Sequence, residues 1–107
     1  MPIRELKNYV GGQWIEPENH GSLDVENPNT GKLIARVPLS TAGETDRAIA
    51  AGAAAFPGWS ATPVARRCEL LFRLAELIRR NEEELTRLIT EENGKSLPDA
   101  RAEVKRA

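Results

Sequence analysis

Cys68 and His20 are the two residues whose types most readily suggest chemistry, and each is the only one of its kind in the sequence. A cysteine nucleophile needs a nearby base to take its proton, and His20 lies far from Cys68 along the chain. Cys68 also falls on the apolar face of a predicted helix, which favours a buried packing role. His20 stands in a polar loop, which favours a solvated surface residue. We therefore predict no catalytic residue in this chain.

The charged clusters and the glycine pair also have structural explanations. The glutamates at 82–84 fall at a predicted helix start, where the helix dipole favours negative charge. The basic doublets at 66–67, 79–80 and 105–106 alternate with glutamates, as solvated helix faces do, which disfavours a phosphate-binding patch. Gly11-Gly12 is followed by neither a dinucleotide fingerprint nor a phosphate-binding lysine motif. The sequence thus predicts no nucleotide site, and one cysteine with one histidine makes no metal site.

Composition bounds the class of protein and its partners. With 107 residues, 40% hydrophobic and 29% charged, the chain fits one small folded domain or a piece of one. Its formal charge of −1 gives no field that attracts nucleic acid or an anionic membrane. No apolar stretch reaches the roughly 18 residues of a membrane span, and the first residues lack a signal-peptide pattern. We expect a cytoplasmic protein with no nucleic-acid or membrane partner.

The first forty residues have the pattern of two short β-hairpins. Residues 8–10 and 13–15 flank Gly11-Gly12, a pair suited to a two-residue turn. Residues 23–26 and 33–37 bracket a longer turn, in which Pro28 takes the second position and Gly31 is available for the left-handed conformation. Pro38 is expected to stop the second hairpin because it has no N–H for a ladder.

Helices are predicted from Thr41 onward. Thr41 and Glu44 have capping-box spacing, and Phe56-Pro57-Gly58-Trp59 is expected to break the helix that they begin. Thr62-Pro63 then restarts an amphipathic helix with proline at its first position. Its apolar side carries Cys68, Leu71, Ala75 and Ile78, and its other side carries Glu69–Arg73 and Glu76–Arg80 pairs.

Two further segments complete the helical part. Asn81 and Glu84 are predicted to cap a continuation that stops at Asn93-Gly94. Ser96 is predicted to open a last helix, which reaches Ala107 without a cap or turn. A natural domain usually finishes its last element, so we expect an interrupted chain.

Several blocks of the sequence, in order, resemble the opening of aldehyde dehydrogenases from about Asn8 to the end. They are Tyr9–Trp14, Val25–Pro38, Phe56–Trp59, Arg73–Ile78 and Leu88–Leu97. Within that family, Pro38–Thr41, Thr62–Arg67 and Asp99–Val104 look most like the coenzyme-A-acylating methylmalonate-semialdehyde dehydrogenase branch.

The resemblance implies an α/β parent fold, of which this chain is the N-terminal part of the cofactor domain. Hairpins would occupy 1–40 and three to four helices 41–107, mainly helical and truncated before the catalytic domain. In the parent, a cysteine thiolate would attack a semialdehyde, NAD would accept hydride, and an acyl-CoA or an acid would be released. The matching catalytic and cofactor residues would all lie downstream of Ala107, so the resemblance gives this chain neither.

Some family members hold a monovalent cation near the positions of Val25 and Glu26, with a carboxylate at that of Glu103. Glutamate stands there in place of the usual aspartate, which makes these three residues weak candidates. The parent's sheet would cover the helices, so we expect this chain alone to form a dimer or larger homo-oligomer through helix contacts. The alternative is a stand-alone helical interaction module that binds a partner through the Cys68-Leu71-Ala75-Ile78 face.

Overall fold

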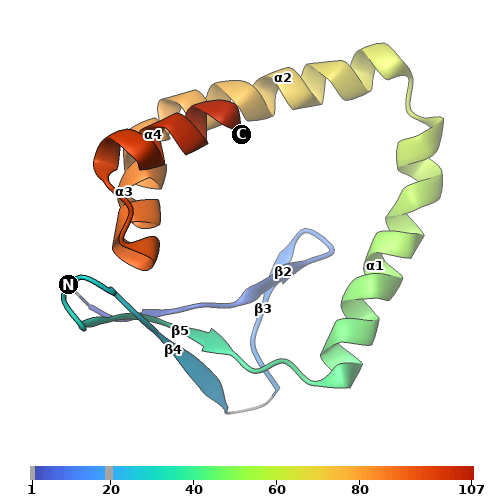
Figure 1. The fold of residues 1–107 in the computed structure, drawn as a ribbon. Coiled ribbons are helices and arrows are strands. Elements are labelled where there is room, and N and C mark those ends of the chain that lie inside the picture. Colours follow the sequence, from blue (N-terminus) through green and yellow to red (C-terminus); the bar gives the residue numbers. More distant parts are fainter. Residues whose placement is uncertain (1, 19–20) are drawn as a thin grey trace. The chain divides into compact units, whose positions relative to one another are not determined.

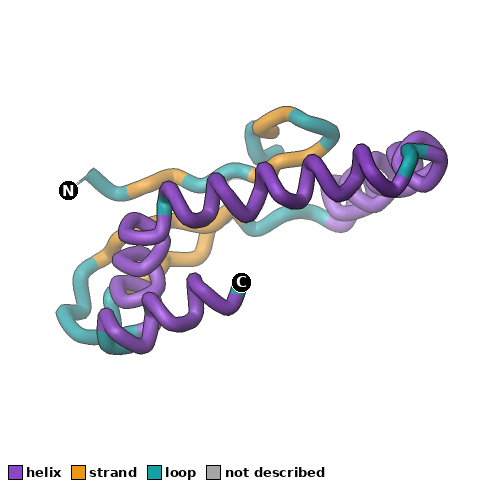
Figure 2. Tube along the Cα trace, turned by 90° about the horizontal axis from the view of Figure 1, so that it is seen from above, coloured by secondary structure: helices purple, strands orange, loops and turns teal. Residues whose placement is uncertain are grey.

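The computed structural model describes residues 2–18 and 21–107, and it is mainly helical, as predicted (Figures 1 and 2). The prediction for His20 lies outside the described residues and stays a prediction. Strands occupy the first part of the chain and helices the second. The elements are β1 (Arg4–Glu5), β2 (Asn8–Val10), β3 (Gln13–Ile15), β4 (Ser22–Glu26), β5 (Leu33–Pro38), α1 (Ala42–Ala61), α2 (Val64–Arg80), α3 (Glu82–Asn93) and α4 (Leu97–Arg106).

Two compact units make up the chain. The strand unit comprises Leu33–Ala61 with the described residues up to Val25, and the helical unit comprises Glu26–Lys32 with Thr62–Ala107. The turn between β4 and β5 therefore belongs with α2, α3 and α4.

The predicted first hairpin is confirmed. Strands β2 and β3 pair in antiparallel register, with Tyr9 opposite Trp14. Gly11 and Gly12 form the turn with φ of 59° and 80°, values that a residue with a Cβ rarely adopts. The rings of Tyr9 and Trp14 lie 5.0 Å apart between centroids, a favourable aromatic separation.

The second predicted hairpin is confirmed within a three-stranded sheet of order β1-β5-β4. Its turn has Gly31 at φ 67°, and the Gly31 amide donates to the Asn27 carbonyl at 2.8 Å. β5 ends at Pro38, as expected. The sequence did not predict β1, which pairs in parallel with β5 and places Arg4 beside Ala35. Ala35 is buried and is the core residue of this sheet.

The capping box at the start of α1 is confirmed, but the predicted break is wrong. The Glu44 amide donates to Thr41 Oγ1 at 3.1 Å, and the Thr41 amide donates to Glu44 Oε2 at 2.8 Å. The helix continues through Pro57 to Ala61. Proline deletes one intrahelical hydrogen bond, and the alanine-rich stretch before it has enough helix propensity to carry the helix past that loss.

The junctions that bound α2 differ from prediction in detail. Pro63 is the residue before the first helical position, and its carbonyl accepts from the Arg67 amide at 3.1 Å. Asn81 is the N-cap residue of α3, as predicted, but its side chain makes no capping hydrogen bond there. Its Nδ2 donates back to the Leu77 carbonyl at 2.8 Å, so the side chain satisfies the end of α2.

The corner between α3 and α4 is confirmed at both of its ends. Gly94 has φ of 81°, and its amide donates to the Thr90 carbonyl at 2.9 Å, which ends α3. Ser96 Oγ accepts from the Asp99 amide at 3.3 Å and begins α4. The turn between β4 and β5 packs on this corner, because a Cβ at Gly94 would lie 3.0 Å from Pro28 Cγ.

α3 and α4 pack against each other and form the core of the helical unit. Ala100 and Val104 are buried one turn apart on α4, and Thr86 of α3 has no exposed surface. The Thr86 hydroxyl has no hydrogen-bond partner among the described residues. A buried hydroxyl in that state destabilises the packing that it joins.

Candidate functional site

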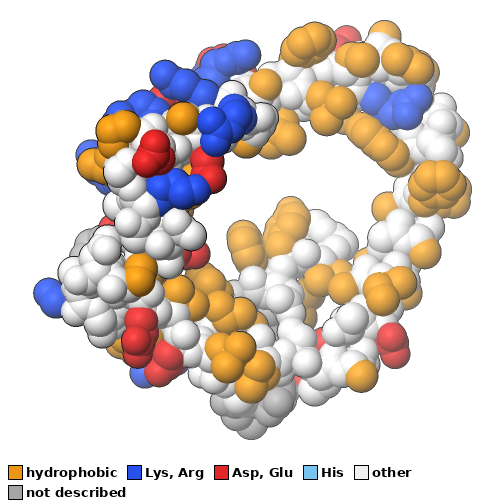
Figure 3. Space-filling view, in the orientation of Figure 1, with side chains coloured by type: hydrophobic (Ala, Val, Ile, Leu, Met, Phe, Trp, Pro, Cys, Tyr) orange, Lys and Arg blue, Asp and Glu red, His pale blue; other side chains and the backbone are white. Residues whose placement is uncertain are grey.

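Cys68 lies on α2 with its side chain exposed, so the prediction of a buried packing cysteine is wrong. The apolar face was located correctly, but α2 has no buried residue. Leu71, on the same face, is 58% exposed. The physical reason is that the helical unit packs α3 on α4 and leaves this face of α2 open to solvent. Figure 3 shows hydrophobic side chains exposed along α2.

The charged side of α2 agrees with prediction in part. Glu76 pairs with Arg80 Nε at 3.0 Å, as the spacing of four predicts. Glu69 pairs with Arg66 at 2.7 Å, three residues earlier, in place of the predicted Arg73. The groups of these pairs are exposed, whereas Arg67 is half-buried and its Nε has no hydrogen-bond partner among the described residues.

Glu44 is the most constrained carboxylate of the strand unit. It accepts one hydrogen bond from the Thr41 amide and another, at 3.0 Å, from the Glu18 amide. Arg47 lies nearby and pairs with the Glu18 side chain. The Thr41 amide, then the Glu18 amide, hold the pKa of Glu44 below its ordinary value. This carboxylate therefore ties the segment before β4 to the start of α1. A group engaged in this way is a poor general base.

The glutamates at 82–84 occupy the first turn of α3, as predicted, and two of them, Glu82 and Glu83, also pair with residues of α4. Arg101 donates to both oxygens of Glu83, at 2.9 and 3.2 Å, and Lys105 lies 3.8 Å from Glu82. The Arg101 hydrogen bond lowers the pKa of Glu83. The sequence did not predict these pairs, which join residues 18 and 23 positions apart. They orient α4 on α3.

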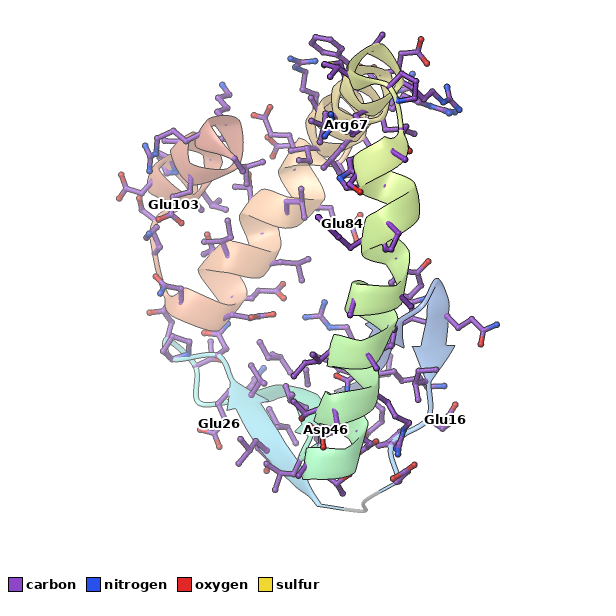
Figure 4. All side chains as sticks on the ribbon, turned by 90° about the vertical axis from the view of Figure 1, so that its right-hand side faces the viewer. Glu16, Glu26, Asp46, Arg67, Glu84 and Glu103 are labelled. Carbon is purple, nitrogen blue, oxygen red and sulfur yellow. The ribbon has the colours of Figure 1, made fainter. Side chains whose placement is uncertain are left out.

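Among the weak cation candidates Val25, Glu26 and Glu103, the two carboxylates, Glu26 and Glu103, are not brought together. Val25 and Glu26 end β4, whereas Glu103 lies on α4; in Figure 4 the labelled Glu26 and Glu103 are well apart. Glu103 instead binds the ammonium of Lys95. Within residues 2–18 and 21–107, no three His, Cys, Asp or Glu side chains gather as a metal site requires. A monovalent-cation site at these three residues stays a prediction.

A shallow hollow of about 240 Å³ lies in the strand unit. Its charged lining is already paired, Lys7 with Glu16 and Arg36 with Glu5, the latter at 2.9 Å. Glu5 and then Asp24 raise the pKa of Arg36 further. The glycines with positive φ, at 11, 12, 31 and 94, sit in turns and a helix end, not in a strand-to-helix phosphate cradle. These glycines therefore serve the turns and the helix end in which they lie.

No helix in the described part of the chain is both long enough and apolar enough to cross a membrane.

Comparison with known proteins identifies the class. The model of the aldehyde dehydrogenase family matches residues 14–107. The chain is 50% identical over 104 residues to malonate-semialdehyde dehydrogenase from Bacillus pumilus, covering 97% of this chain and 21% of that protein. It is 48% identical over 104 residues to malonate-semialdehyde dehydrogenase 1 from Geobacillus thermodenitrificans, covering 97% and 22%.

A solved structure agrees with these sequence relatives. The structure described as methylmalonate-semialdehyde dehydrogenase from Sinorhizobium meliloti 1021, complexed with NAD, superposes with a TM-score of 0.91 at 27% identity. The match covers 98% of this chain and 21% of that one. The chain belongs to the aldehyde dehydrogenase family and spans about a fifth of the length of these relatives. The predicted family is thus confirmed.

Proposed function

We propose that this chain is the N-terminal part of an NAD-dependent semialdehyde dehydrogenase of the malonate and methylmalonate type. The observation that carries the proposal is the 50% identity that extends over 97% of the chain, with a malonate-semialdehyde dehydrogenase. Helix caps and turns account for the motifs that this chain contains. Its own role is then to fold and to support the part that performs the chemistry.

The complete enzyme would oxidise a semialdehyde through a cysteine thioester and release an acyl-CoA or an acid. NAD supplies the hydride acceptor when it is bound. We assign Cys68 no nucleophilic role, because it is exposed on α2 and no base pairs with it among the described residues. The 107-residue chain therefore binds no nicotinamide cofactor and has no turnover. We place the enzyme in the cytoplasm.

Open apolar surface supports self-association of this chain. Leu71 and Leu74 on α2 are 58% and 52% exposed. Contiguous exposed surface of this kind drives association. The same face supports the second candidate function, a stand-alone helical module that docks a partner helix. The two candidates differ in the sequence that the gene encodes beyond Ala107.

The discriminating experiment starts from the reading frame. The gene is sequenced beyond Ala107, and the full product is purified and supplied with malonate semialdehyde and NAD, with and without coenzyme A. NADH formation by the extended product supports the dehydrogenase. A stop codon directly after Ala107, together with a partner captured through α2 and lost in a Leu71→Glu variant, would support the module instead.

A further inference from the structure

Lys95 and Glu103 form the most protected ion pair of the helical unit. The Lys95 ammonium contacts Glu103 Oε1, and the two side chains are only 29% and 39% exposed. By comparison, the side chains of Arg66 and Glu69 on α2 are 59% and 63% exposed. Partial burial strengthens the attraction between the charges and reduces screening by salt.

The backbone around Lys95 holds it in position. The residue before it, Gly94, ends α3 with a hydrogen bond to Thr90, and the residue after it, Ser96, caps α4. Lys95 thus has little freedom between two anchored neighbours, and its side chain reaches across to the second turn of α4. Because the helix corner already orders the backbone at Lys95, forming the ion pair costs less conformational entropy.

We propose that the Lys95 ammonium supplies at Glu103 the positive charge that a bound monovalent cation would supply, and that the chain binds no such cation there. A second cation on the same carboxylate would face the ammonium at short range and be repelled. The other acidic candidate, Glu26, is exposed and lies apart from Glu103 (Figure 4). In this proposal the pair with Lys95 is the reason that Glu103 holds no cation.

The test compares cations at constant ionic strength. Amide chemical shifts of Lys95 and Glu103 are recorded for the isotope-labelled 107-residue chain in potassium, sodium and tetramethylammonium chloride. The wild-type shifts are expected to be equal in the three salts. In Lys95→Gln, which leaves Glu103 without its ammonium, a saturable shift specific to potassium or sodium is expected. Lys105→Gln is the matched control, because it removes a pair with Glu82 and leaves Glu103 paired.

Two results would overturn the proposal. One is a saturable potassium- or sodium-specific shift at Glu103 in the wild type, which would show that a cation binds beside Lys95. The other is a Lys95→Gln variant whose chemical shifts are also equal in the three salts, which would show that the Lys95 ammonium does not stand in for a bound cation. If circular dichroism shows that Lys95→Gln has lost its helices, Glu103→Asp takes its place, since shortening the side chain withdraws the carboxylate from Lys95. No enzymatic activity enters this test, so its failure leaves the proposed dehydrogenase untouched.

Discussion

Gly94→Ala is predicted to destabilise the helical unit by two separable effects. The first is backbone strain, because Gly94 has φ of 81° and the left-handed region costs other residues about 1–2 kcal/mol. Alanine restricts the unfolded chain and recovers about 0.4–1 kcal/mol of that cost. The second effect is contact, because the new Cβ would lie 3.0 Å from Pro28 Cγ and 3.4 Å from Asn29 Oδ1. Carbon atoms prefer about 3.5–4.0 Å, so the turn must move, at a further cost of about 1 kcal/mol.

Gly31→Ala is the matched control for the contact. Gly31 belongs to the same unit and has φ of 67°, but a Cβ there would meet nothing within 4 Å. Urea unfolding monitored by circular dichroism should show a loss of about 1 kcal/mol for Gly31→Ala and about 2 kcal/mol for Gly94→Ala. Equal losses in the two variants would refute the packing of the turn between β4 and β5 on the α3–α4 corner.

Other features of the structure predict four further outcomes. Thr41→Ala removes the hydroxyl cap of α1 and should cost about 1 kcal/mol in urea unfolding, whereas an unchanged midpoint would contradict the capping box. Thr86→Val replaces a buried, unpaired hydroxyl with a methyl group and should raise the free energy of unfolding by about 1 kcal/mol; a loss would mean that the hydroxyl has a partner. Hydrogen bonds from the Thr41 and Glu18 amides lower the pKa of Glu44, so its contribution is full above its unfolded pKa of about 4.3 and is lost as pH falls through the folded value. Melting temperatures measured from about pH 5 to pH 3 should therefore fall less steeply in Glu44→Gln than in the wild type, and parallel curves would count against this linkage. Cys68 is exposed in the single chain and should react fully with iodoacetamide without denaturant when the chain is dilute. Protection at the lowest chain concentration, measured by intact mass, would contradict that exposure, whereas protection that grows with concentration would report self-association through α2.

Local rules predicted the turns and caps of this chain well. Gly11-Gly12, Gly31 and Gly94 are all in the left-handed conformation where a turn or helix end was expected. The capping box at Thr41 and the cap at Ser96 depend on groups within three residues of each other, and such spacing is visible in the sequence.

Contacts between distant segments account for most of the features that the sequence did not predict. β1 is two residues long and carries no alternating pattern, so its pairing with β5 had no local signal. The Lys95–Glu103 pair spans a helix corner, where helical spacing rules do not apply. The exposure of Cys68 was mispredicted. An apolar helix face indicates that the helix packs against another element, but it does not show whether that element lies within this chain.

The most direct measurement concerns turnover by the 107-residue chain itself. The purified chain, with its intact mass verified, is mixed with malonate semialdehyde, NAD and coenzyme A, and NADH is monitored by absorbance beside a buffer blank. If its residues serve only to fold and support the chemistry of a longer enzyme, the two traces coincide at every protein concentration. A rate of NADH formation that rises in proportion to the chain, and that disappears when Cys68 is alkylated, would contradict that role.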